Sequence, residues 1–173
     1  MPNIDLAQYK EPITGSNLSA NNLADLINSH KIVILHFVRH LGCIYCQHSV
    51  DQLFELKQRN PHFPPIIFVH QSSLETGDKF FAHHFPEALH ISDPQYNLYH
   101  YFGIKKLKGF NFFNPKMILK GILLTFKGYL NTYKGGDVTM LSGTFLFHNG
   151  KLLWEHRAKY AGDEPQWERI NIK

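Results

Sequence analysis

Both cysteines of the 173-residue chain lie three positions apart, as Cys43 and Cys46. A thiol attacks disulfides and peroxides in its thiolate form, so a lowered thiol pKa raises the reactive fraction at neutral pH. At this spacing, the second sulfur can attack the first after its oxidation and close a small disulfide. We therefore expect redox chemistry, with Cys43 as the nucleophile and Cys46 as the resolving thiol.

The cysteine pair lies between a predicted strand and a predicted helix. Residues 31–38 are a nearly continuous apolar run, which is typical of a strand buried on both faces. Gly42 ends the turn that follows, and apolar residues then recur at helical spacing up to residue 60. This pattern predicts that Cys43 begins the helix and faces solvent, while Cys46 lies on its buried side.

Positive charge is expected around the Cys43 thiol. A helix N-terminus presents unpaired backbone N–H groups and the positive end of the helix dipole, and both favour a thiolate. Arg39, His40 and His48 are close in sequence and can add positive charge. Arg39 is also a candidate, together with Arg157, for stabilising the charge that develops on peroxide oxygens.

The remaining elements predict a single α/β domain over residues 1–173. A first helix is expected over 18–28 with Ser19 as its N-cap, after an irregular lead-in over 1–17. Apolar strands are expected at 65–70 and 88–92, each followed by a helix. Asn149-Gly150 separates strands at 144–148 and 151–156, which predicts a type I′ hairpin. The order indicates a three-layer sandwich around a mixed central sheet, closed by a C-terminal β-hairpin.

An aromatic-rich insertion is expected at about 104–136. Within it, residues 115–130 predict an amphipathic helix or a folded-over loop. We expect a lid packed over the sheet; a patch that contacts a membrane surface or forms a homodimer is the alternative.

Composition narrows the classes of function. The net charge is +4 and the pI is near 9.0, but the basic residues are scattered, so no nucleic-acid partner is expected. The N-terminus has no apolar signal-peptide core, and no apolar stretch is long enough for stable membrane insertion. Two cysteines as one C-x-x-C pair suit a reducing cytoplasm, so a cytoplasmic protein is expected.

The chain resembles the peroxiredoxin-like, AhpC/TSA-like branch of the thioredoxin superfamily, which includes the prostamide/prostaglandin F synthases of animals. The resemblance rests on segments spread over most of the chain: FVRHLGCIYC at 37–46, Asp93-Pro94 with Leu98-Tyr99 and Phe102-Gly103, Phe110–Phe113, Gly135-Gly136, and WEHR at 154–157. It implies a thioredoxin-like fold, Cys43 and Cys46 as the redox pair, and a role for His156-Arg157 near the site. A peroxide-type substrate is then expected.

The electron donor is expected to be an external thiol, from the thioredoxin or glutathione system. No glycine-rich nucleotide-binding motif is visible, so no cofactor is expected.

The chain differs from the sequence patterns of thioredoxins and of typical peroxiredoxins. Thioredoxins have a Trp where this chain has Gly42, and a cis-proline where Gly143 precedes the hairpin strand. Typical peroxiredoxins have a Thr three residues before the attacking cysteine. Here Cys43 fills that place, so a literal alignment would make Cys46 the attacking residue.

Other functions stay open at this point. A protein disulfide oxidoreductase and a non-catalytic thioredoxin-fold binding module are the main alternatives. A zinc site built from the cysteines and some of the 12 histidines is less favoured, because no second ligand pair has finger-like spacing except His83-His84, which would point apart on a helix. A Cys-His hydrolase is also less favoured, because it has no need of a second cysteine at this spacing. We expect no metal.

Overall fold

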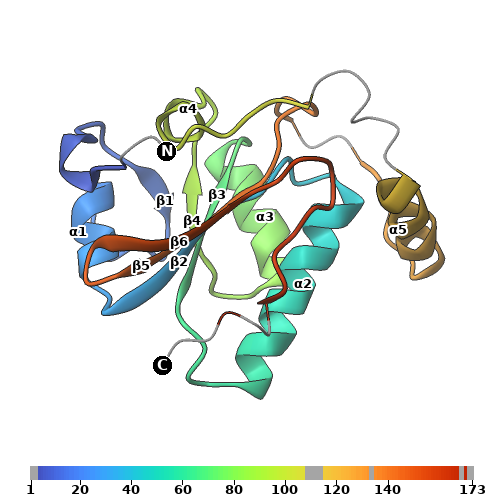
Figure 1. Cartoon of the computed structure of the whole chain (residues 1–173), viewed down its shortest axis with the longest axis horizontal. Coiled ribbons are helices and arrows are strands. Elements are labelled where there is room, and N and C mark those ends of the chain that lie inside the picture. The colour runs from blue at the N-terminus through green and yellow to red at the C-terminus, as the bar shows by residue number, and fades with distance from the viewer. Residues whose placement is uncertain (1–3, 108–114, 133–134, 168–169, 171–173) are drawn as a thin grey trace.

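A computed structural model describes residues 4–107, 115–132, 135–167 and 170, and its centre is a twisted six-stranded sheet (Figure 1). The strands lie in the order β1-β4-β3-β2-β5-β6. They comprise β1 (Thr14–Ser16), β2 (Ile32–Phe37), β3 (Ile66–His70), β4 (Leu89–Ser92), β5 (Gly143–His148) and β6 (Lys151–Arg157). Strands β2, β3 and β4 are parallel, and each of the others runs antiparallel to its neighbours. The mixed sheet and its C-terminal hairpin are therefore confirmed.

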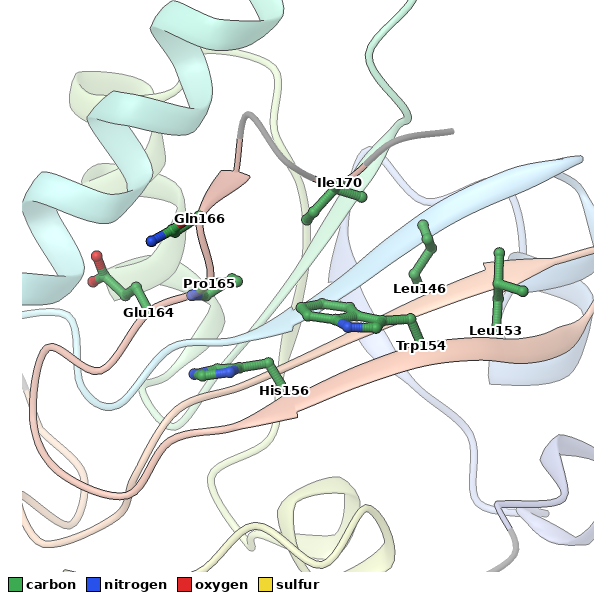
Figure 2. A pocket seen from close by; sticks show the side chains of 8 residues that line it. All are labelled: Leu146, Leu153, Trp154, His156, Glu164, Pro165, Gln166 and Ile170. Carbon is green, nitrogen blue, oxygen red and sulfur yellow. The ribbon is translucent and has the colours of Figure 1, made fainter. Parts of the chain in front are cut away.

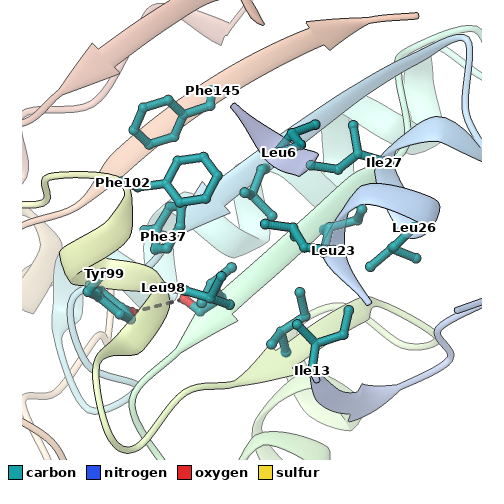
Figure 3. Close-up of a cluster of buried hydrophobic side chains, with 14 of the residues drawn as sticks. Leu6, Ile13, Leu23, Leu26, Ile27, Phe37, Leu98, Tyr99, Phe102 and Phe145 are labelled. Atoms are coloured by element: carbon teal, nitrogen blue, oxygen red, sulfur yellow. Dashed lines mark hydrogen bonds between the residues drawn. The ribbon is translucent and has the colours of Figure 1, made fainter. Parts of the chain in front are cut away.

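Helices cover both faces of this sheet. They comprise α1 (Leu23–Asn28), α2 (Ile44–Arg59), α3 (Leu74–His84), α4 (Asn97–Tyr101), α5 (Pro115–Phe126) and a 3₁₀ turn, η1 (Leu6–Gln8). Side chains of α1, α4 and η1 join one buried cluster with Phe37 and Phe145 (Figure 3). Those of α2 and α3 join a second cluster with Ile34, Phe68 and Leu146. The two clusters lie on opposite faces of the sheet because side chains alternate along a strand.

The hairpin turn confirms the sequence prediction. Asn149 and Gly150 both have positive φ, 48° and 73°, as a type I′ turn requires. The N-terminal region differs from the prediction in two ways. First, α1 begins at Leu23, because the Asn22 side chain accepts the backbone N–H of Asp25 and caps the helix, whereas Ser19 lies outside it. Second, the predicted lead-in contains β1, a polar three-residue edge strand that is too short to show a pattern.

The predicted helix within 115–130 forms as α5, but it does not cover the sheet. It packs beside α2, where the Tyr45 hydroxyl donates to the Met117 carbonyl at 2.7 Å. Figure 1 shows α5 beside the N-terminal part of α2, on the side away from the strands. The lid prediction is therefore wrong in its placement. The Phe110–Phe113 motif lies outside the described residues.

Tyr99 ties together the strand ends that lead to the cysteines. Its buried hydroxyl is hydrogen-bonded to the carbonyls of Val38, which directly follows β2, and of Val69, the last residue but one of β3. A buried carbonyl left without a donor costs free energy.

We predict that Tyr99→Phe lowers the free energy of unfolding by about 1–2 kcal/mol, measured by urea denaturation. The matched control is Tyr101→Phe, which removes an exposed hydroxyl that donates to the Asp5 carbonyl. It should change stability by less than about 0.5 kcal/mol. Equal effects of the two variants would contradict the role given to Tyr99.

Candidate active site

Cys43 and Cys46 lie at the N-terminal end of α2. Cys43 is the N-cap residue, in extended backbone conformation, and Cys46 is in the first turn. Both are free thiols, and both are buried: Cys43 is 1% exposed and Cys46 is 5% exposed. The buried position of Cys46 matches the prediction. The expectation that Cys43 faces solvent is wrong, because a later segment of the chain lies over the end of the helix.

That segment is residues 129–132, which we call the strap. It follows α5 and crosses the N-terminus of α2. Its hydrogen bonds to α2 and its entry turn are Thr132 N–H to the Gly42 carbonyl (2.9 Å), Ile44 N–H to Asn131 Oδ1 (3.2 Å), Gln47 Nε2 to the Leu130 carbonyl (3.1 Å) and Tyr129 hydroxyl to Asp51 Oδ2 (2.8 Å). The strap therefore caps the helix, since the Cys43 side chain makes no cap hydrogen bond of its own.

Residue 42 must be a glycine because the strap lies so close to it. A Cβ atom at residue 42 would lie 1.5 Å from the Thr132 carbonyl oxygen, far inside van der Waals contact. Gly42 does not have positive φ, so a turn conformation is not the reason for this glycine. Only the absence of a side chain lets the two backbones approach.

Arg39 is the charged partner of Cys43. Its Nη1 donates to the Cys43 sulfur at 3.1 Å. The same guanidinium donates from Nε to the Met140 carbonyl at 3.0 Å and from Nη2 to the Val138 carbonyl at 2.6 Å. Arg39 is buried, so these contacts hold its positive charge against the sulfur with little solvent screening.

Gln71 helps to fix this arrangement. Its Nε2 donates to the Arg39 carbonyl, and its Oε1 accepts the backbone N–H of Asp137 at 2.6 Å. Gln71 is itself buried at the end of β3. It thus links the turn after β2 to the segment whose carbonyls receive the Arg39 guanidinium.

The surroundings push the two thiols in opposite directions. A hydrogen bond from Cys46 is the largest cause that lowers the pKa of Cys43, and Arg39 and the amides of Cys46 and Tyr45 lower this pKa further, against burial. Burial and the adjacent Cys43 raise the pKa of Cys46 well above its usual range. The arrangement therefore favours a Cys43 thiolate that accepts a hydrogen bond from a Cys46 thiol.

The two histidines do not supply the expected positive charge. Burial, followed by repulsion from Arg39, lowers the pKa of His40 to about 4, so its ring is neutral at pH 7. Burial also lowers the pKa of His48, with Lys120 and Lys127 adding to the effect. His40 is adjacent to Arg39 and buried, but the charge at the site comes from the arginine.

Arg157 is not brought to the cysteines. Its guanidinium donates from Nε and Nη2 to the Phe102 carbonyl at 3.2 and 3.1 Å and lies over the Phe145 ring, 5.1 Å from its centroid. Phe102 and Phe145 belong to the buried cluster on the face opposite α2. Its neighbour in sequence, His156, points to the α2 face, where it meets Asp163.

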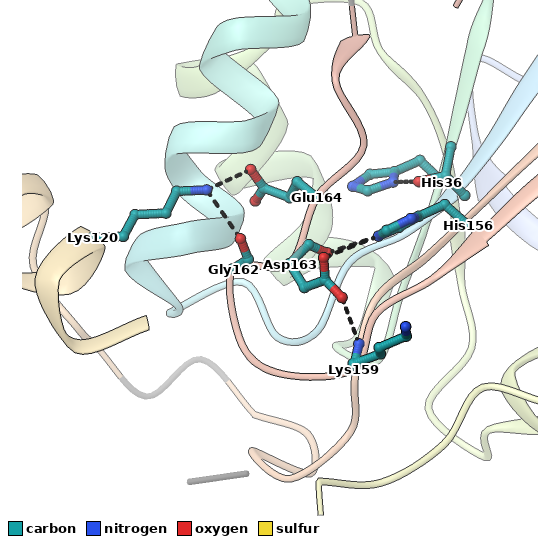
Figure 4. A network of polar contacts seen from close by, with 8 residues as sticks. His36, Lys120, His156, Lys159, Gly162, Asp163 and Glu164 are labelled. Carbon is teal, nitrogen blue, oxygen red and sulfur yellow. Dashed lines mark hydrogen bonds and ion pairs between the residues drawn. The ribbon is translucent and has the colours of Figure 1, made fainter. Parts of the chain in front are cut away.

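An ion pair that the sequence did not indicate lies beside Cys43. Lys120 reaches from α5 to Glu164, 3.0 Å away, and to the Gly162 carbonyl at 3.2 Å (Figure 4). Burial raises the pKa of Glu164, and the negative charge of Cys43 raises it further. The partners are 44 positions apart, so no spacing rule could have found them.

A pocket of about 540 Å³ lies on the same face of the sheet, between the hairpin and the segment that follows it. Figure 2 shows its lining: Leu146, Leu153, Trp154, His156, Glu164, Pro165, Gln166 and Ile170. A hydrogen bond with Asp163 raises the pKa of His156. Since Glu164 belongs to both the ion pair and the pocket wall, the pocket adjoins the covered side of the cysteine site.

No metal-binding cluster of three or more His, Cys, Asp or Glu occurs among the residues that the structure places. The zinc alternative therefore gains no support from this part of the chain. Within the same residues, no helix is both long and apolar enough to cross a bilayer.

We predict that Gly42→Ala displaces the strap and speeds alkylation of Cys43 by iodoacetamide at least about tenfold. The added methyl group disrupts the hydrogen bonds between the strap and α2, so movement of the strap away from Cys43 costs less free energy. The rate is measured by mass spectrometry, with the modified cysteine identified by peptide mapping. Tyr99→Phe is the control, since it destabilises the protein without touching the strap. Unchanged alkylation in Gly42→Ala, or an equal increase in the control, would show that the strap does not cover Cys43.

Comparison with known proteins assigns the chain to a family. A family model described as AhpC/TSA antioxidant enzyme matches residues 51–160, which is more than half of the chain. The match begins after Cys46, so it does not itself assign the roles of the two cysteines. No curated protein sequence matches this chain.

Solved structures with the same fold include bacterial peroxiredoxins. Xanthomonas campestris peroxiredoxin Q is 18% identical, with 92% of this chain and 87% of that chain covered and a TM-score of 0.60. A cysteine-to-serine mutant of Xylella fastidiosa PrxQ is 14% identical, with coverages of 97% and 89% and a TM-score of 0.55. At these identities the likeness concerns the fold, which is thioredoxin-like. With the family match, these findings show that the chain belongs to the AhpC/TSA family of antioxidant enzymes.

Proposed function

We propose that this protein is a thiol peroxidase in which Cys43 attacks the peroxide and Cys46 resolves the oxidised product. The observation that carries the proposal is the contact between the Arg39 guanidinium and the Cys43 sulfur, 3.1 Å, at a helix N-terminus. A cation and converging N–H groups stabilise a thiolate, which is the species that attacks peroxides. Membership of an antioxidant enzyme family is consistent with this chemistry.

The reaction has two chemical steps. The Cys43 thiolate attacks one peroxide oxygen, the O–O bond breaks, and the leaving oxygen takes a proton to depart as an alcohol or water. Cys43 is then a sulfenic acid. The Cys46 sulfur then attacks the Cys43 sulfur. As the S–S bond forms, the thiol proton of Cys46 passes to the hydroxyl of the sulfenic acid, the S–O bond breaks, and water leaves. Arg39 is placed to stabilise the charge on the departing oxygen as well as the thiolate.

The two pKa directions support this order of roles. A residue that attacks first needs to be ionised, and the site favours ionisation of Cys43 over Cys46. The literal peroxiredoxin alignment reverses the order and makes Cys46 the attacking residue. Burial argues against that order, because burial and the adjacent Cys43 raise the pKa of Cys46 by more than Arg39 lowers it, and this holds Cys46 in the thiol form.

The catalytic cycle also needs the strap to open and a donor to reduce the disulfide. With Cys43 1% exposed beneath the strap, both the peroxide and the reducing thiol require movement of residues 129–132. We propose an external thiol, from the thioredoxin or glutathione system, as that donor. A dithiol that must be regenerated in this way suits a reducing cytoplasm.

Protein disulfide exchange is the second candidate, favoured by the C-x-x-C spacing at the start of a helix on a thioredoxin-like fold. It needs an accessible sulfur and a groove for an extended protein strand. The strap fills the space over Cys43, and this favours a small peroxide as the substrate.

The deciding experiment follows intact mass after one equivalent of hydrogen peroxide is added to the reduced protein. We predict rapid loss of two hydrogens in the wild type. In Cys46→Ser, Cys43 should instead gain one oxygen, because no resolving sulfur remains. In Cys43→Ser, oxidation should be slow.

Two results would change the account. Oxygen trapped on Cys46 in Cys43→Ser, at the wild-type rate, would keep the peroxidase chemistry and reverse the two roles. Slow oxidation in the wild type, together with rapid reduction of a protein disulfide, would reject the peroxidase proposal and support disulfide exchange.

A further inference from the structure

Helix α5 presents an apolar face to solvent. The exposed side chains recur at helical spacing on one side of the helix and continue into the strap: Ile118, Leu119, Ile122, Leu123, Phe126 and Leu130. Leu119 is 61% exposed and Phe126 is 86% exposed. Single exposed apolar residues are common, but a contiguous row of this kind marks an interaction surface.

The opposite side of α5 is anchored to the protein body, so this orientation is built into the fold. Leu124 is buried, and the Met117 carbonyl accepts the Tyr45 hydroxyl. Lys120 reaches across to the buried Glu164 carboxylate at 3.0 Å. Gly121 allows the close approach, since a Cβ there would lie 2.7 Å from the Tyr45 hydroxyl oxygen. A partner on the exposed face can therefore bind without displacing existing contacts.

Lysines near this face indicate that its partner carries negative charge. The stretch 104–136 contains seven lysines and no Asp, Glu or Arg, although the whole chain has a net charge of only +4. Outside this stretch the chain is therefore net negative. Two of the seven lysines, Lys106 and Lys120, pair with Asp137 and Glu164. Lys116 lies in the first turn of α5, and the exposed Lys127 directly follows the helix. An apolar face bordered by lysines matches a surface that is both apolar and anionic.

We propose that α5 docks on the surface of a lipid bilayer that contains anionic headgroups, with its apolar face in the interface. A transmembrane orientation is excluded for α5 because its 12 residues fall short of the roughly 20 needed to cross the hydrocarbon core. Self-association through this face is disfavoured, because it would bring the lysines of two copies together.

The position of α5 gives this docking a consequence for the redox site. The helix leads directly into the strap, and Leu130 of the exposed face supplies the carbonyl that binds Gln47 beside Cys43. When α5 is docked, the strap that covers Cys43 lies at the bilayer surface. The proposal does not depend on the peroxidase reaction, because it concerns only where the chain binds.

The test is co-sedimentation of the full chain with vesicles of phosphatidylcholine alone and of phosphatidylcholine mixed with phosphatidylglycerol. We expect binding to the mixed vesicles, weakened by added salt. The double variant Leu119→Ser/Leu123→Ser should lose binding at least about tenfold. Lys127→Gln should lose about fivefold, since it removes one surface charge.

The matched control is Leu153→Ser, which removes an equally exposed leucine, 63%, from β6. It should bind like the wild type, and circular dichroism checks that every variant is folded. Three results would overturn the proposal: no binding to mixed vesicles, equal loss in the control, or a concentration-dependent dimer in ultracentrifugation that the double variant abolishes. The last result would assign the face to a second copy of the chain.

Discussion

The need to stabilise negative charge on a buried sulfur is the constraint on which the rest of the site depends. Removing a thiolate from water is costly, so Cys43 can ionise only where nearby groups offset its desolvation. The Arg39 guanidinium, the first amides of α2 and the Cys46 thiol together do this. The arginine is held in turn by the carbonyls of Val138 and Met140, so the sulfur's charge depends on a segment about a hundred positions away.

The strap makes that site a closed one. It satisfies N–H and carbonyl groups at the start of α2, and it excludes water from the sulfur beneath. Exclusion of water strengthens the contact between Arg39 and Cys43, since the interaction of two charges grows as the local dielectric constant falls. The strap also keeps substrates away from the Cys43 sulfur. The closed structure therefore favours the thiolate but blocks its reaction, and a substrate can reach the sulfur only when residues 129–132 move.

Local patterns predicted the elements around the cysteines, and distant contacts escaped them. The apolar run of β2, the helical spacing after Cys46 and the Asn149-Gly150 turn each follow from neighbouring residues, and each was found in the structure. Two features were not predicted: the strap residues Asn131 and Thr132 that cover Cys43, and the Lys120–Glu164 ion pair. The contacts in these features join residues 44 to 90 positions apart, and a single sequence carries no signal for such contacts. Arg157 was expected near the site from a resemblance, but strand alternation turns it to the other face.

The most direct test of the account is a pH titration of thiolate absorbance in the reduced protein. Because the pKa of Cys43 is lowered, one thiolate should appear as the pH rises through values below those of an ordinary cysteine, near 8.5. This transition should vanish in Cys43→Ser and move to higher pH in Arg39→Met, while Arg39→Lys, which keeps the charge, should shift it less. A first transition at ordinary thiol pH, or one that persists in Cys43→Ser, would contradict the claim that the site holds Cys43 as its reactive thiolate.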